Sequence, residues 1–191
     1  MKKIISKLVQ KGVNLDQYIS LEFFARDGSW QTKSYSNHVK KLYLWEIDKT
    51  FEIELIKNFP NSHISIGDSF VLAKKDKYRN KFNLLVFDNP QGIYGKYCEH
   101  FEALELSYSL LSNKGVIIFN INKSPYDLKL NMAWKLRRDN YYGFDSINIS
   151  SEQMIQFYSS KLKNYGFNVL SLFEEERNRE YLSYLVFIVS K

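Results

Sequence analysis

Four acidic side chains stand at the ends of short apolar runs, where strands are expected to finish. Glu22 lies within ISLEFF, Glu46 ends KLYLWE, Asp68 ends HISIGD and Asp88 ends FNLLVFD. The carboxyl ends of parallel strands meet at one edge of a sheet, which is where such folds bind ligands. A carboxylate can accept hydrogen bonds from two neighbouring hydroxyl groups at once. These residues therefore predict a polar ligand site at the carboxyl edge of a sheet.

The first of these acids opens a turn with an unusual composition, EFFARDG, which ends at Gly28. A turn that brings backbone close to a ligand usually carries glycine, because glycine adopts left-handed conformations at no steric cost. Phe24 and Arg26 stand here where glycines are expected. Arg26 can pair with an anionic group of a ligand. Two interpretations stay open: an altered ligand loop, or a site that Phe24 plugs and that has lost its ligand.

Strands and helices are expected to alternate along the chain, and this order positions the acids. The expected strands are 19–24, 41–47, 63–68, 82–88, 114–121, 169–174 and 181–190. The expected helices are 2–12, 29–39, 51–59 and 99–111. A further helix is expected to begin at a capping box formed by Ser150 and Gln153 and to end at Gly166. The last two strands, joined by the charged turn EEERNRE, predict an antiparallel hairpin. The pattern predicts an α/β fold in which a doubly wound, mostly parallel seven-stranded sheet forms a single domain, 1–191, with an N-terminal helix in 1–14.

This order of elements, together with the acidic strand ends, resembles that of class I S-adenosylmethionine-dependent methyltransferases over roughly residues 15–191. In that family the first strand ends in acid-x-Gly-x-Gly-x-Gly, which Glu22 and Gly28 match at its two ends. The resemblance implies S-adenosylmethionine as the cofactor and implies cofactor contacts by Glu22, Arg26, Gly28, Glu46, Asp68 and Asp88. It assigns the ribose hydroxyls to Glu46 and the adenine amine to Asp68. Asp48 and Asp68 are equally well explained as helix caps.

The fourth acid begins the sequence DNPQG, which resembles the Asn/Asp-Pro-Pro-aromatic motif of amino-methyltransferases. Glutamine and glycine replace the second proline and the aromatic residue, which puts nucleobase methylation in doubt. The resemblance implies that Asn89, Tyr94 and Tyr97 contact the acceptor, the tyrosines by stacking. Catalysis would depend on positioning, with Asp88 or His100 taking the proton. A first-turn helix histidine without a catalytic role is the alternative for His100, and no metal site is expected.

The segment 122–148 is extra sequence between an expected strand and the capped helix. Insertions at this point of the resembled fold commonly shape the acceptor pocket. Trp134, Arg137 and Arg138 provide an aromatic ring and positive charges for a sugar, phosphate or base. The alternative is a surface helix whose tryptophan packs inward and whose arginines are solvated.

Composition limits the remaining classes. The 191 residues carry a net charge of +6, and a single cysteine excludes an intramolecular disulfide and fits a reducing cytoplasm. No apolar run reaches the length of a membrane span. The basic residues are scattered, so a nucleic-acid partner is possible but not favoured. The predicted function is methyl transfer to O or N of a small-molecule or glycan-like acceptor. Alternatives are a non-catalytic binding protein with the same fold and a nucleic-acid amino-methyltransferase.

Overall fold

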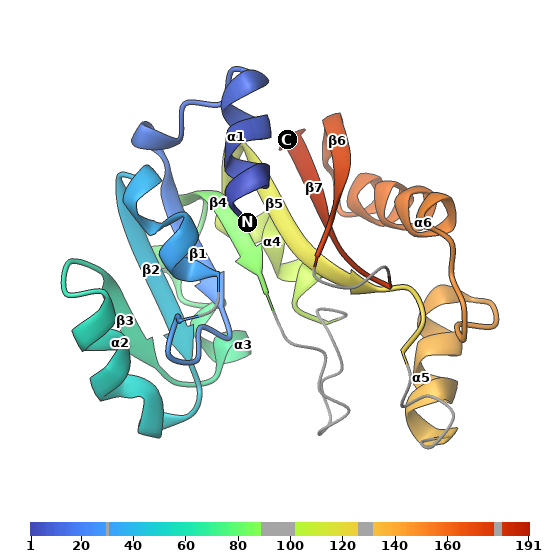
Figure 1. The fold of residues 1–191 in the computed structure, drawn as a ribbon, viewed down its shortest axis with the longest axis horizontal. Coiled ribbons are helices and arrows are strands. Elements are labelled where there is room, and N and C mark those ends of the chain that lie inside the picture. The colour runs from blue at the N-terminus through green and yellow to red at the C-terminus, as the bar shows by residue number, and fades with distance from the viewer. Residues whose placement is uncertain (30, 89–101, 126–131, 178–180) are drawn as a thin grey trace.

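Residues 1–29, 31–88, 102–125, 132–177 and 181–191 are described by the structure, a computed structural model. The strands in these ranges form one sheet with the order β3-β2-β1-β4-β5-β7-β6 (Figure 1). The strands are β1 (Ile19–Phe23), β2 (Lys41–Glu46), β3 (His63–Ile66), β4 (Phe82–Phe87), β5 (Leu111–Asn122), β6 (Asn168–Glu176) and β7 (Leu182–Ser190). The helices are α1 (Lys2–Gln10), α2 (Glu52–Asn58), α3 (Ser69–Leu72), α4 (Ser107–Leu110), α5 (Met132–Tyr142) and α6 (Ser151–Asn164).

The pairing of the strands confirms the predicted sheet. β1 pairs in parallel with β2 and β4, and the parallel part continues to β3 on one side and β5 on the other. β7 runs antiparallel to both β5 and β6, so the chain closes with the expected hairpin. Because β1, β2 and β4 run in the same direction, their carboxyl ends meet at one edge of the sheet.

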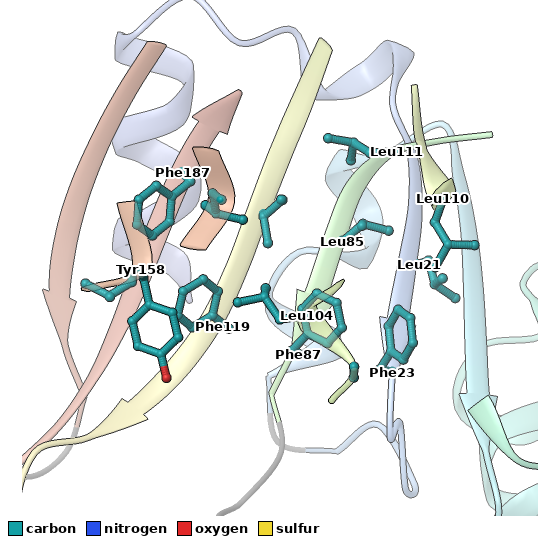
Figure 2. Packing of buried hydrophobic residues seen from close by; sticks show 14 of the residues in the cluster. Leu21, Phe23, Leu85, Phe87, Leu104, Leu110, Leu111, Phe119, Tyr158 and Phe187 are labelled. Atoms are coloured by element: carbon teal, nitrogen blue, oxygen red, sulfur yellow. The ribbon is translucent and has the colours of Figure 1, made fainter. Parts of the chain in front are cut away.

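Apolar side chains cover both faces of this sheet. One face carries a ring-rich cluster in which Phe23 stacks on Phe87 with ring centroids 4.4 Å apart, and Phe119 stacks on Phe187 at 5.7 Å (Figure 2). The other face is covered by α1, whose Ile4, Ile5 and Leu8 are buried in a second cluster. Side chains alternate along a strand. Leu21 and Phe23 of β1 therefore lie in the first cluster, and Glu22 between them faces the α1 side.

The expected helix at 29–39 is wrong. In the described part of this range the structure has two short 3-10 turns, Thr32–Ser34 and Ser36–His38. Serine, threonine and asparagine dominate the stretch, and their side chains compete with the helix for backbone hydrogen bonds. As a result, the described residues of 29–39 contain no α-helix whose dipole could act on a ligand at the loop after β1.

The expected helix at 99–111 also ends too late. Its described part contains a 3-10 turn, Leu104–Leu106, and the short α4, and β5 already begins at Leu111. Leu110 ends α4 and Leu111 begins β5, and both are fully buried. The apolar residues at the end of the expected helix are therefore divided between a helix and a strand. The capping box is confirmed: the Ser150 hydroxyl accepts from the Gln153 amide, and the Gln153 side chain accepts from the Ser150 amide. None of the helices described is both long and apolar enough to cross a bilayer.

Candidate functional site

The loop after β1 has a left-handed backbone at each position where the resembled motif has glycine. The φ angle is 58° at Phe24, 52° at Arg26 and 67° at Gly28. Left-handed φ angles are uncommon for residues other than glycine, since the Cβ atom approaches the following carbonyl oxygen. The chain thus keeps the turn geometry of a glycine-rich loop although two of the three glycines are replaced.

Hydrogen bonds from β2 hold this strained loop in place. The amide of Ala25 donates to the carbonyl of Trp45 at 2.9 Å. The Glu46 carboxylate accepts from the amide of Arg26 at 2.6 Å through one oxygen and from the amide of Asp48 at 2.8 Å through the other. Only 6% of Glu46 is exposed. Glu46 therefore fixes the loop from behind, and each of its oxygens keeps a further lone pair for a ligand hydroxyl.

Gly28 is the loop position where a side chain is least tolerated. A Cβ atom built there would overlap the ring of Phe59, and the φ of 67° already disfavours other residues. We expect Gly28→Ala to lower the free energy of unfolding by about 2–4 kcal/mol, from backbone strain and from displacement of the ring.

Gly12→Ala is the matched control for this change. Gly12 has a φ of 79°, but a Cβ there meets no atom within 4 Å, so only the strain of about 1–2 kcal/mol is expected. Urea unfolding of both variants measures the difference. Equal losses in the two variants would show that the contact with Phe59 does not matter.

The loop forms one wall of a pocket at the carboxyl edge of the sheet. The cavity measures about 20 Å³, room for about one water molecule. The lining residues are Glu22, Phe24, Ala25, Arg26, Asp27, Gly28, Gln31, Thr32 and Asp88. The half-buried Phe24 ring packs near Phe23, with the two centroids 5.8 Å apart. The pocket thus joins the loop to the ends of β1 and β4 and brings Glu22, Arg26, Gly28 and Asp88 together. Their contacts with a cofactor stay predictions.

Glu22 has the most perturbed carboxyl group of this pocket. Burial raises the pKa of Glu22 to about 8, the hydroxyl groups of Tyr35 and Thr32 act in the opposite direction, and the charge of Asp88 raises it further. The Tyr35 hydroxyl donates to Glu22 at 2.6 Å, and both side chains are buried. A carboxyl group with this pKa is mostly protonated at pH 7.

Asp88 is held by two residues that the sequence interpretation did not identify. Arg177 donates to Oδ1 of Asp88 at 3.0 Å, and the hydroxyl of Tyr184 donates to the same oxygen at 2.9 Å. Burial raises the pKa of Asp88, while the charge of Arg177 and the Tyr184 hydrogen bond lower it. Arg177 follows β6 and lies in the charged turn EEERNRE of the hairpin. The many charged residues of this turn are the one feature of the sequence that could have drawn attention to Arg177.

The other acids and Arg26 have local partners. The Asp68 carboxylate accepts from the amide of Phe70 and caps α3, and the Asp48 carboxylate accepts from the amide of Thr50. These bonds fit the capping alternative, and a contact of Asp68 with adenine stays a prediction. The Arg26 guanidinium lies 5.4 Å from the centroid of the Phe51 ring.

The described part of 122–148 contains α5, which buries two of the three predicted acceptor residues. Trp134 is 4% exposed and Arg138 is fully buried, with Arg138 donating to the carbonyl of Asn122 at 3.0 Å. Arg137 forms an ion pair with Glu102. The inward tryptophan fits the alternative of a packed helix, but the burial of Arg138 fits neither interpretation. Acceptor contacts by the three residues stay predictions.

Several predicted positions lie outside the described residues. These are Asn89, Tyr94, Tyr97 and His100. Within the described ranges, no group of three or more His, Cys, Asp or Glu side chains could hold a metal ion.

Comparisons with known proteins support the assignment of the fold. No family model matches the sequence, and no curated protein matches it either. Solved structures do match. M. jannaschii TYW2, crystallised in complex with AdoMet, superposes with a TM-score of 0.61 at 11% identity, covering 100% of this chain and 77% of that one. The candidate methyltransferase yhhF from Escherichia coli superposes with a TM-score of 0.60 at 14% identity, covering 100% of this chain and 85% of that one.

A third structure is the candidate RNA methyltransferase PH1948 from Pyrococcus horikoshii. It gives a TM-score of 0.58 at 16% identity and covers 100% of this chain and 83% of the other. These similarities, with the strand order 3-2-1-4-5-7-6, define the class I methyltransferase fold. At these identities the similarity concerns the fold alone.

Proposed function

We propose that this protein is an S-adenosylmethionine-dependent methyltransferase that acts on O or N of a small-molecule or glycan-like acceptor. The observation that carries the proposal is the loop at 22–28, which keeps left-handed backbone at all three glycine positions of the cofactor motif. Maintaining two non-glycine residues in this conformation costs stability. A turn that merely ended a strand would not need this geometry.

The side chains around the loop fit the chemistry of this cofactor. S-adenosylmethionine supplies an activated methyl group, and it carries a sulfonium, an ammonium group and two ribose hydroxyls. Glu46 is the proposed acceptor for the hydroxyls, because each of its oxygens accepts one backbone amide and keeps a further lone pair. Glu22 and Asp88 give the pocket an acidic lining that suits a cationic ligand. Asp88, held by Arg177 and Tyr184, is the described candidate for receiving the acceptor's proton.

Calorimetric titration with S-adenosylmethionine and with its demethylated product tests this proposal. Glu46→Ala is expected to weaken binding about tenfold or more, because hydrogen bonds to a charged acceptor contribute about 1.5–3 kcal/mol. Glu54→Ala, which removes an exposed carboxylate from α2, is the matched control and should leave the affinity unchanged. Thermal denaturation of each variant shows whether the protein still folds. If the unmodified protein gives neither heat nor a thermal shift at millimolar ligand, the non-catalytic binding protein becomes the better interpretation.

A nucleic-acid acceptor is the second candidate. It is favoured by the net charge of +6 and by the similarity to PH1948, which is described as an RNA methyltransferase candidate. Binding through scattered basic residues alone weakens steeply with added salt. Structured RNA that stays bound at physiological salt would therefore favour this candidate over a small-molecule acceptor.

A further inference from the structure

Basic side chains that are scattered along the sequence gather at the amino edge of the sheet, which is the edge opposite the loop pocket. Lys40 and Lys41 donate their backbone amides to the residue ahead of β1, so they lie where β1 and β2 begin (Figure 1). Lys81 directly precedes β4. The antiparallel β7 ends at the same edge beside Lys114 of β5 and is followed by Lys191. The strand pairing thus places five lysines along one edge.

The segment that leads into β4 adds further positive charge. Residues 74–81 have the sequence KKDKYRNK, with five basic residues and one acid. The acid, Asp76, lies 3.9 Å from Arg79, but the two side chains are 96% and 69% exposed, so solvent screens this pair strongly. The Lys191 side chain donates to Asn80 of this segment, which joins it to the end of β7. We call the following residues the amino-edge patch: Lys40, Lys41, His63, Lys77, Arg79, Lys81, Lys114 and Lys191.

Two stacked rings lie within the amino-edge patch. Tyr43 of β2 and His63, the first residue of β3, stack with ring centroids 4.4 Å apart and an interplanar angle of 22°. The Lys81 ammonium lies 4.4 Å from the centroid of the Tyr43 ring. Tyr43 is buried, whereas His63 is exposed. His63 is therefore the outer ring of a stacked pair beside basic side chains.

We infer that the amino-edge patch binds single-stranded nucleic acid, with phosphates along the lysines and one base stacked on His63. Surfaces that bind single strands combine a positively charged track for the backbone with aromatic rings for the bases. An anionic membrane also offers phosphates, but it has no base for the exposed ring. Docking of a nucleic acid at this surface is therefore favoured over docking of a lipid headgroup.

This inference goes beyond the proposed function and does not depend on it. The six residues of β4 separate the amino edge from the loop pocket, which at about 3.3 Å per residue is a distance of about 20 Å. A strand bound at the patch therefore leaves the pocket accessible, and the two sites can be tested separately.

Fluorescence anisotropy with a labelled oligouridylate, titrated with the unmodified protein at several salt concentrations, measures this binding. A patch that neutralises about five phosphates of a single strand should lose about a hundredfold in affinity between about 50 and 200 mM salt. Lack of binding at about 50 mM salt would overturn the inference.

A double variant of two exposed patch residues, Lys77→Ala with Arg79→Ala, tests the location. With two phosphate contacts fewer, the same change in salt should cost only about twentyfold, and affinity at about 0.1 M salt should fall about tenfold or more. The control is Lys33→Ala with Lys49→Ala, which removes the same charge from two exposed lysines that follow β1 and β2. It should change affinity by no more than about twofold, because the carboxyl edge lies beyond the screening length of about 10 Å at 0.1 M salt. Equal losses in the two double variants would show that the patch is not the binding surface.

His63→Ala separates base stacking from charge attraction. Loss of the ring should weaken oligouridylate binding about fivefold or more and leave the binding of inorganic polyphosphate, which has no bases, unchanged. Thermal denaturation confirms that each variant is folded. An unchanged affinity of His63→Ala for oligouridylate would contradict the stacked base. Binding to phosphatidylserine vesicles but not to oligouridylate would overturn the choice of nucleic acid as the partner.

Discussion

Replacing Arg177 by methionine is expected to lower the free energy of unfolding by about 3–5 kcal/mol at pH 7, because the change leaves a buried carboxylate without its counter-charge. The side chains of Arg177 and Asp88 are only 8% and 4% exposed, and their atoms Nη1 and Oδ1 are 3.0 Å apart. The Tyr184 hydroxyl, which donates to the same oxygen, offsets only part of the loss. Urea unfolding at pH 7 measures the effect.

The pH dependence of this variant separates lost charge pairing from lost packing. Burial raises the pKa of Asp88, and removing the opposing charge of Arg177 raises it further. A carboxyl group whose pKa is higher in the folded than in the unfolded state binds its proton more tightly when folded. The variant therefore loses stability as the pH rises above the unfolded pKa. The deficit of Arg177→Met should be smallest near pH 4 and largest at pH 7.

Two comparisons make this prediction specific. Arg79→Met removes an exposed arginine that lies 3.9 Å from Asp76, and a surface pair of this kind contributes at most about 1 kcal/mol. The double variant Asp88→Asn, Arg177→Met removes the buried charge as well and should recover part of the stability. The account fails if Arg177→Met costs no more than Arg79→Met, or if its deficit is the same at pH 4 and pH 7.

The order of the elements could be predicted from the sequence because it depends on local patterns. The continuous apolar run of β4 and the capping box of α6 are each visible within a dozen residues. The acids at strand ends were predictable for the same reason, since the end of an apolar run fixes the end of its strand. Glu22, Glu46 and Asp88 accordingly lie at one edge of the sheet, as expected.

Features that depend on distant parts of the chain could not be predicted in this way. Arg177 and Tyr184 reach Asp88 across 89 and 96 residues of sequence. The hairpin that carries them was predicted, but its pattern does not indicate that it contacts the end of β4. The left-handed backbone at Phe24 and Arg26 runs against the preference of both residues and is held by hydrogen bonds from β2. The helix predicted at 29–39 was wrong for a local reason, because the serines and the asparagine of this stretch favour turns over helix.

The role of α5 is decided by Trp134→Ala, which we expect to lower the free energy of unfolding by about 3–5 kcal/mol, as large-to-small changes in a core do. The ring is 4% exposed, belongs to the same apolar cluster as Phe119 and lies 5.7 Å from the Arg138 guanidinium. Removing it leaves a cavity and exposes part of a fully buried cation. Leu136→Ala, on the same helix and 61% exposed, is the matched control and should change stability by no more than about 0.5 kcal/mol.

The same variant distinguishes a packed helix from a segment that shapes the acceptor pocket. A ring that only closes over an acceptor can be removed with little loss of folding, whereas a core ring cannot. Where Trp134→Ala is still folded, below its unfolding transition, its affinity for S-adenosylmethionine should match that of the unmodified protein, because Trp134 does not line the loop pocket. A normal midpoint of urea unfolding for Trp134→Ala would exclude the core role and restore the interpretation that this segment shapes the acceptor pocket. A large loss of stability with normal cofactor affinity would assign α5 to the scaffold, and the acceptor contacts would then have to come from other residues at the carboxyl edge.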